Sequence, residues 1–158
     1  MEPRDAARVL EIYAMGIRTR LATFETAVPS WRGWDLGHLR HTRIVLERGG
    51  AVLGWAALSA MSRREAYSGV AEVSCYVDPG HRGEGVGTGL LGAVVAGSEG
   101  EGVWTLQASV FPGNRAAMGL LKKHGFRVVG TRERIARLEG VWMDTVLLER
   151  RSRGAGGG

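Results

Sequence analysis

The chain has 158 residues, a formal net charge of +5 and an isoelectric point near 10.1. This length fits one domain with its own hydrophobic core, and the apolar runs are too short or too interrupted to span a bilayer. The positive charge is almost all arginine, spread along the chain rather than gathered on one predicted element, so we expect no nucleic-acid partner. The single Cys75 can form no internal disulfide, and the start of the chain lacks a signal peptide's order, which indicates a cytoplasmic protein.

Periodicity and turn residues predict an alternation of helices and strands. In chain order the expected elements are helices over 5–19 and 31–41, a hairpin of strands over 43–48 and 51–58, a strand over 70–78, a helix that ends near 97, a strand over 103–110, a helix from 114 to about 124, and strands over 126–135 and 141–149.

This order predicts an α/β fold in which one mixed sheet carries helices on its faces. A strand ahead of the first helix is usual in such a fold, but this chain begins at the helix. Either the start is truncated or the sheet manages without that strand. We expect one domain over residues 1–150 and a disordered glycine-rich tail over 151–158.

The segment HRGEGVG, residues 81–87, joins the strand predicted at 70–78 to the helix that follows it. Alternating glycines let the backbone approach an anion closely, and the free N–H groups of a helix's first turn can bind phosphate oxygens. A plain strand-to-helix turn needs neither three glycines nor Arg82. We therefore interpret the segment as a phosphate-binding loop.

Three phosphate ligands compete for this loop. A P-loop needs Lys followed by Ser or Thr after its last glycine, and none is present here. The dinucleotide pattern G-x-G-x-x-G occurs at Gly87, Gly89 and Gly92, but inside the predicted helix rather than at its entrance. The remaining candidate is the pyrophosphate of coenzyme A.

Two motifs carry a family resemblance. Residues 82–87, RGEGVG, resemble the R-x-x-G-x-G loop of the GNAT acyl-CoA N-acetyltransferases, and residues 114–126, NRAAMGLLKKHGF, resemble their N-x-x-A-x-x-L-x-x-x-x-G-F signature. Further segments, among them ATFET at 22–26 and AEVSCYV at 71–77, are similar to the phosphinothricin acetyltransferase branch. That branch acetylates the α-amine of glutamate-like compounds such as phosphinothricin and methionine sulfoximine.

The resemblance implies a GNAT fold, which is a mixed, mostly antiparallel sheet flanked by helices. It also implies acetyl-CoA as the cofactor, a small-molecule amine as the substrate, no metal, and a homodimer, as in many relatives. The family pairs the pantetheine arm with the strand that includes Tyr76 and Val77. The residues expected to bind coenzyme A are Tyr76, Val77, Arg82, Gly83, Glu84, Gly85, Val86, Gly87, Thr88 and Asn114.

Glu72 is the candidate catalytic base. An ammonium group must lose a proton before its nitrogen can attack a thioester directly. A carboxylate in the middle of a strand is costly unless it has a task, and strand alternation places Glu72 on one face with Ser74 and Tyr76. The alternative is a surface glutamate on a half-exposed strand. The resemblance also places the branch's catalytic glutamate at this position.

The leaving thiolate has no evident acid. Leu121 occupies the position where many relatives carry Tyr or His, and it can donate no proton. Because a thiol has a pKa of about 8.5, we expect its anion to leave without a dedicated acid.

The resemblance places substrate-binding residues at Phe24, Glu25, Arg64 and Tyr67. An arginine suits a carboxylate or a phosphinate, although a solvated loop charge is an equal alternative for Arg64. Two other functions stay open: acetylation of a protein or peptide N-terminus, and a non-catalytic acyl-CoA-binding module. Leu121 favours the module, and Glu72 argues against it.

Overall fold

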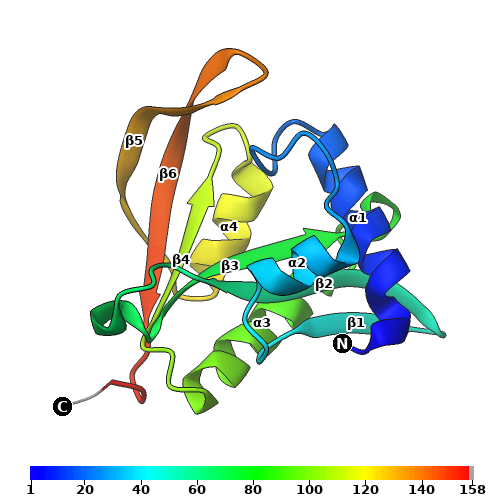
Figure 1. Ribbon diagram of the computed structural model, residues 1–158, viewed down its shortest axis with the longest axis horizontal. Helices are drawn as coiled ribbons and strands as arrows, with labels where there is room; N and C mark the ends of the chain where they lie inside the picture. The colour runs from blue at the N-terminus through cyan, green and yellow to red at the C-terminus, as the bar shows by residue number, and fades with distance from the viewer. Residues whose placement is uncertain (157–158) are drawn as a thin grey trace.

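Within residues 1–156, which the computed structural model describes, six strands form one sheet with helices on both faces (Figure 1). The strands are β1 (Ile44–Arg48), β2 (Ala51–Ala60), β3 (Val70–Val77), β4 (Thr105–Val110), β5 (Arg127–Leu138) and β6 (Val141–Arg151). The α-helices are α1 (Ala6–Arg18), α2 (Trp31–Gly37), α3 (Val86–Gly100) and α4 (Arg115–Lys123). Three 3₁₀ helices are η1 (Pro3–Asp5), η2 (Glu65–Tyr67) and η3 (Pro79–His81).

The strand order is β1-β2-β3-β4-β6-β5, and every neighbouring pair is antiparallel except β3 and β4, which are parallel. The prediction of a mixed, mostly antiparallel sheet with flanking helices is confirmed. Within residues 1–156 no strand precedes α1, and β1 forms one edge of the sheet.

Two apolar cores lie on opposite faces of the sheet. Strand β2 contributes to both because its successive side chains point to opposite faces. Leu58 packs with residues of α3 and α4, whereas Trp55 packs with residues of α1 and α2. Both side chains are at most 1% exposed, and burial of such a residue stabilises the fold by roughly 2–3 kcal/mol. The apolar run of β2 is therefore explained by cover on both faces.

The parallel pair β3–β4 separates part-way along its length. Its pairing covers only Val70–Glu72 against Thr105–Gln107, although β3 continues to Val77 and β4 to Val110. Beyond the separation β3 stays paired with β2, and β4 stays paired with β6. The edge of β3 that faces β4 is consequently without a strand partner from residue 73 onward. Glu72 stands where the gap opens.

Several element boundaries differ from those predicted by two residues or more, and the largest difference is at the end of α2. Helix α2 ends at Gly37 rather than at 41, because His38 is extended and Arg43 donates hydrogen bonds to the carbonyls of His38 (2.9 Å) and Leu39 (2.6 Å). The last hairpin is longer than expected because β5 contains an irregularity between Arg132 and Ala136, after which pairing with β6 resumes.

Ordered structure extends past the boundary predicted at residue 150. Strand β6 includes Arg151, and the Ser152 hydroxyl accepts the N–H groups of Gly154 (3.1 Å) and Ala155 (2.9 Å). Disorder in the remainder of the tail stays a prediction, and residues 157–158 lie outside the described residues. In the described part of the chain, no helix combines the length and the apolar character that a bilayer crossing requires.

Candidate active site

Two cavities meet in the gap between β3 and β4. The first, of about 440 Å³, includes Glu72 in its lining and is called the glutamate cavity here. The second, of about 760 Å³, includes the glycine loop and is called the loop cavity. Both cavities include Cys75, Tyr76, Asn114 and Leu120 in their lining, so they form one continuous site.

The glycine loop forms a wall of the loop cavity. Arg82, Gly83 and the residues from Gly85 to Thr88 line it. Gly83 (φ 76°) and Gly85 (φ 81°) adopt left-handed conformations that favour glycine, and Gly85 is the N-cap of α3. The first N–H groups of α3 have no intrahelical partners, so they are available to an anion.

The charges of the loop cavity are complementary to phosphate groups. Its basic lining residues are His81, Arg82, Arg115 and Lys123, and no carboxylate lines it among the described residues. Arg82 was predicted from its motif, whereas Arg115 and Lys123, which follow Asn114 in the chain, were not predicted. The cations and the free N–H groups together fit a ligand with several phosphates.

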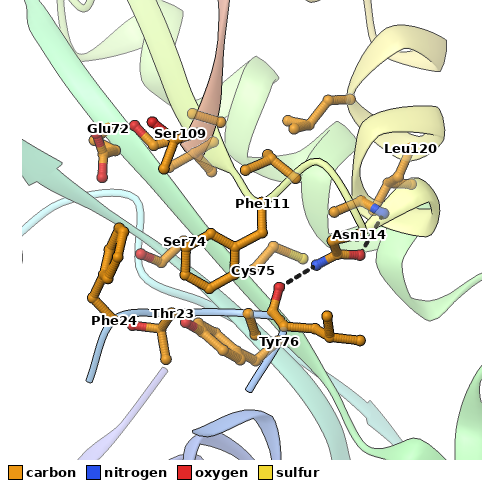
Figure 2. Close-up of a pocket in the computed structure, with 18 of the residues that line it drawn as sticks. Thr23, Phe24, Glu72, Ser74, Cys75, Tyr76, Ser109, Phe111, Asn114 and Leu120 are labelled. Atoms are coloured by element: carbon orange, nitrogen blue, oxygen red, sulfur yellow. Dashed lines mark hydrogen bonds between the residues drawn. The ribbon is translucent and has the colours of Figure 1, made fainter. Parts of the chain in front are cut away.

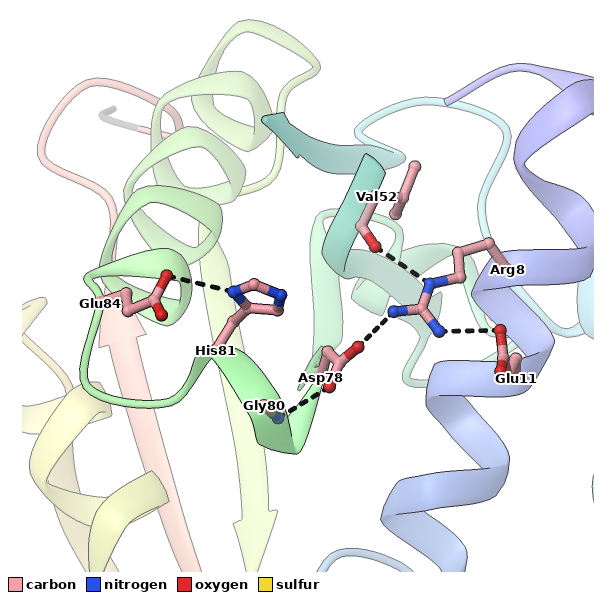
Figure 3. Close-up of polar contacts among 7 residues, drawn as sticks. All are labelled: Arg8, Glu11, Val52, Asp78, Gly80, His81 and Glu84. Carbon is pink, nitrogen blue, oxygen red and sulfur yellow. Dashed lines mark hydrogen bonds and ion pairs between the residues drawn. The ribbon is translucent and has the colours of Figure 1, made fainter. Parts of the chain in front are cut away.

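Arg8 on α1 anchors the start of the glycine loop (Figure 3). Its guanidinium forms an ion pair with Asp78, and its Nε donates to the Val52 carbonyl (3.1 Å). Asp78 also accepts the Gly80 N–H (2.8 Å). This backbone bond, followed by the Arg8 contacts, lowers the pKa of the Asp78 carboxyl. The loop is therefore fixed to α1 and β2.

Glu84 does not line the loop cavity, although it was expected to bind the cofactor. Its carboxylate lies 3.2 Å from His81 Nδ1 (Figure 3). It also accepts a hydrogen bond from Arg48 Nη1 at 2.7 Å. These contacts, that with His81 first, lower the pKa of Glu84. Glu84 therefore holds the glycine loop in place through its contacts with His81 and Arg48.

Asn114 lies where the two cavities meet, but both ends of its amide group already form hydrogen bonds within the protein. Its Oδ1 accepts the Ala117 N–H (3.1 Å), and its Nδ2 donates to the Leu21 carbonyl (3.1 Å), as Figure 2 shows. Asn114 thus caps α4 and holds the loop that follows α1. Tyr76 lines both cavities, and Val77 lines the loop cavity.

Glu72 is held by residues of the neighbouring strand. Gln107 Nε2 donates to Glu72 Oε2 at 3.1 Å, and Ser109 Oγ lies 3.5 Å from the same oxygen. No hydrogen bond to Oε1 is found among the described residues. In Figure 2 Glu72 and Ser109 lie at one end of the site, and Asn114 and Leu120 lie at the other. Glu72 therefore offers one free carboxylate oxygen to a ligand in the glutamate cavity.

Only two of the four expected substrate residues line the glutamate cavity. Phe24 and Glu25 do so, and the Phe24 ring packs edge-on against Phe111 with centroids 4.8 Å apart. Arg64 and Tyr67 line neither cavity, and the Arg64 guanidinium lies 5.5 Å from the Tyr67 ring centroid. Their substrate role remains a prediction.

His38 is a lining residue of the glutamate cavity that the sequence analysis missed. Its ring stacks on Trp34 with centroids 4.1 Å apart, and its Nδ1 donates to the Trp34 carbonyl (2.6 Å). Because a carbonyl can only accept, Nδ1 carries the hydrogen. Burial lowers the pKa of His38, so Nε2 is the acceptor nitrogen of a neutral ring. The sequence predicted His38 within a helix and gave no signal of this contact.

Three further side chains limit the chemistry of the site. Cys75 lines both cavities, but burial raises the pKa of its thiol to about 12, so it is not a ready nucleophile. Leu121 is buried in the core and lines the glutamate cavity. His124 lines neither cavity, and its two ring nitrogens lie 2.9 Å from the Leu120 carbonyl and 3.1 Å from the Thr88 carbonyl. His124 therefore links α4 to α3.

The separated strands, the glycine loop and the nearby carboxylate define an acyltransferase that takes its acyl group from a coenzyme A thioester. The sequence profile of the acetyltransferase (GNAT) family matches residues 10–126. The chain belongs to this family and has its fold, and it is an N-acetyltransferase. The expectation of a GNAT enzyme is confirmed.

Individual relatives agree with this assignment. The YwnH protein of Bacillus subtilis is 34% identical over 94% of this chain and 94% of its own length. A phosphinothricin N-acetyltransferase of Alcaligenes faecalis is 35% identical over 92% of this chain and 77% of its own. A phosphinothricin acetyltransferase of Sinorhizobium meliloti, solved in complex with acetyl-CoA, is 27% identical with a TM-score of 0.87 over 99% of this chain and 88% of its own.

Acetyl-CoA is the cofactor of GNAT acetyltransferases, and the residues of the loop cavity fit it. A Cβ at Gly83 or Gly85 would fall in open space, so the absent side chains leave room beside the backbone N–H groups. Arg82, Arg115 and Lys123 supply the positive charge that its phosphates require.

Proposed function

We propose that this enzyme acetylates the α-amino group of a small amino acid or a glutamate-like analogue of the phosphinothricin or methionine sulfoximine type. The observation that carries the proposal is Glu72, which offers a free carboxylate oxygen in the glutamate cavity, and that cavity is continuous with the cofactor site. The names of the relatives support the substrate class.

In the proposed mechanism Glu72 is the general base. When bound, acetyl-CoA supplies the thioester carbonyl. The free edge of β3 beyond Glu72 presents backbone groups that an extended chain can pair with. Glu72 Oε1 takes one proton of the substrate ammonium, directly or through a water. The nitrogen then forms the new N–C bond as the C–S bond breaks, and the second proton that the nitrogen loses passes to solvent. The protonated Cys75 thiol supports direct attack over an acyl-enzyme route.

We propose that no protein acid protonates the leaving thiolate. Leu121 can donate no proton, and His124 lines neither cavity, with its ring nitrogens beside the backbone carbonyls of Leu120 and Thr88. The thiolate leaves as an anion and takes its proton from solvent, because the pKa of a thiol is about 8.5.

We further propose a cytoplasmic homodimer in which residues 1–150 form the catalytic domain. The lone Cys75 suits a reducing compartment. Apolar side chains exposed on the last hairpin support the dimer, and these are Val128, Val129, Ile135, Val141 and Trp142.

Release of free thiol from acetyl-CoA tests the proposed function. We expect release with methionine sulfoximine, phosphinothricin or a neutral amino acid, and none with a short peptide. Glu72→Gln should lower kcat by about 10²- to 10⁴-fold while acetyl-CoA affinity, measured by calorimetry, stays the same. Glu101→Gln is the control, because Glu101 is an exposed carboxylate that lines neither cavity.

The other outcomes separate the alternatives. Acetyl-CoA binding without thiol release from any amine would indicate a non-catalytic module. Release with the peptide alone would indicate an N-terminal acetyltransferase. Full activity of Glu72→Gln at neutral pH would remove the base assignment and leave the family assignment intact.

A further inference from the structure

The glutamate cavity is lined by carboxylates and by no lysine or arginine among the described residues that would bind the carboxylate of an amino-acid substrate. Its carboxylates are those of Glu25 and Glu72. An α-amino acid carries a carboxylate one carbon away from its amine, and a buried carboxylate needs a cation or several hydrogen-bond donors. The arginine expected for this task, Arg64, lies outside the cavity.

Arg132 lies outside the glutamate cavity and contacts two of the residues that line it. Arg132 on β5 donates through Nη2 to Ser109 Oγ (2.6 Å) and through Nε to Thr145 Oγ1 (3.2 Å). Ser109 and Thr145 both line the glutamate cavity, and Thr145 is only 2% exposed. Arg132 itself is half-buried and is paired with Thr145 across β5 and β6.

The direction of these hydrogen bonds fixes what the two hydroxyl groups can do. A guanidinium has donors and no acceptor, so each hydroxyl accepts from Arg132 and cannot donate to it. The hydroxyl hydrogens of Ser109 and Thr145 must therefore point away from Arg132. Ser109 Oγ donates its hydrogen to Glu72 Oε2 across a long 3.5 Å, and a bound carboxylate would have to take this hydrogen over. No acceptor for the Thr145 hydroxyl hydrogen is found among the described residues, and the Ser109 hydrogen is in a long contact, so both hydroxyl groups can turn to a ligand while Arg132 supplies positive charge on their other side.

We propose that Ser109 and Thr145, polarised by Arg132, form the subsite for the α-carboxylate of the substrate. The proposal rests on the proposed function, in which the amine lies at Glu72. Ser109 contacts both Glu72 and Arg132, so the ammonium and carboxylate sites are adjacent. This spacing matches the two groups of an α-amino acid, and it makes the free carboxylate the feature that the enzyme selects.

The proposal is tested by the ratio of kcat/KM for two matched substrates, because a general loss of activity lowers both values and leaves their ratio unchanged. An amino acid that the enzyme acetylates is compared with its carboxamide, which keeps the amine and side chain but loses the charge. The wild type should prefer the acid. Arg132→Gln should lower kcat/KM for the acid about 10- to 100-fold, the size expected for loss of a charged hydrogen-bond network. Its kcat/KM for the carboxamide should fall less than about 3-fold.

Companion variants separate recognition from folding. Thr145→Val keeps the side-chain shape and removes one hydroxyl, and Ser109→Ala removes the other, so each should reduce the acid preference in part. Arg132→Lys should restore part of it, because the charge remains but the two-armed geometry is lost. Thermal unfolding of each variant checks that the fold is retained.

Three results would overturn the subsite. The first is an equal loss for acid and carboxamide in Arg132→Gln, which would mean that Arg132 acts only by holding Ser109 beside Glu72. The second is an acid-specific loss in Arg64→Gln with none in Arg132→Gln, which would place the carboxylate at Arg64. The third is a wild type without acid preference. Failure of the proposed function is a different result, since the wild type would then release no thiol with any amine.

Discussion

At the scale of single residues, the absence of a side chain at Gly16 shapes the site. A Cβ at this position of α1 would lie 2.6 Å from Cδ1 of Tyr76, closer than packed atoms approach. The Tyr76 ring is held between Trp55, with centroids 4.9 Å apart, and Tyr13, at 4.8 Å. These two rings leave the Tyr76 ring no room to move toward the core.

We predict that Gly16→Ala impairs the enzyme even though alanine is the better helix former. The added methyl group should push the Tyr76 ring toward the cavities and raise the KM for acetyl-CoA several-fold. Steady-state kinetics with varied acetyl-CoA measures this effect.

Gly119→Ala on α4 is the matched control. A Cβ there meets nothing within 4 Å, so the change should stabilise the fold by up to about 1 kcal/mol and leave KM unchanged. An unchanged KM in Gly16→Ala would show that Tyr76 can move without consequence.

At the residue scale, the sequence located residues that line the cavities where its signal was local, and their roles stay predictions. The glycine loop and Glu72 were recognised because spacing and strand alternation lie within a few neighbouring residues. Arg132 was missed because its contact with Ser109 depends on β6 lying between β4 and β5. Nothing in the local pattern specifies that strand order.

At the scale of elements, the end of α2 places His38 in the glutamate cavity. Residues 31–41 were predicted to be helical, but Arg43 binds the carbonyls that follow Gly37 and holds that segment extended. Leu39 N–H then donates to the Leu58 carbonyl of β2 (2.7 Å). The helix end is set by contacts distant in sequence, so helical periodicity alone could not locate it.

We predict that His38 makes stability depend on pH. Burial lowers the pKa of His38, and the nearby Arg43 cation lowers it further, while the Trp34 carbonyl and Asp35 oppose this. The unfolded chain therefore binds more protons than the folded one as the pH falls below about 6.5. The contribution of His38 to stability is complete above that pH and is lost as the pH falls through its folded pKa.

Denaturant unfolding between pH 7.5 and 5 measures this loss. The free energy of unfolding of the wild type should decline over the range, and His38→Gln should show a shallower decline because it cannot take up the proton. Equal slopes for the two proteins would contradict the prediction.

At the scale of the whole molecule, the hairpin of β5 and β6 projects beyond the rest of the sheet (Figure 1). Val141 is 62% exposed and Trp142 is 45% exposed, although the guanidinium of Arg137 lies 4.3 Å from the Trp142 ring centroid. Strand β5 is also an edge of the sheet in residues 1–156. Val128, Val129 and Ile135 on this edge strand are exposed as well. Exposed apolar side chains on an edge strand are typical of a surface that pairs with another chain.

We predict that this hairpin forms the homodimer contact. Trp142→Glu should weaken the dimer at least 10-fold, because a charge would have to be buried against apolar groups. Sedimentation velocity over a range of protein concentrations measures the change. Leu36→Glu is the control, since Leu36 is 69% exposed on α2, and it should leave the dimer unchanged. A wild type that sediments as a monomer at high concentration would exclude the dimer.

The early separation of β3 and β4 sets a conflict between stability and activity. If the parallel pairing continued past Glu72 and Gln107, it would add backbone hydrogen bonds and close both cavities. Side chains of α4, among them Ala117 and Leu120, line both cavities in the opening. Selection for stability alone would favour continued pairing of the two strands. The enzyme is therefore less stable at this opening than its fold allows, and the opening provides the site.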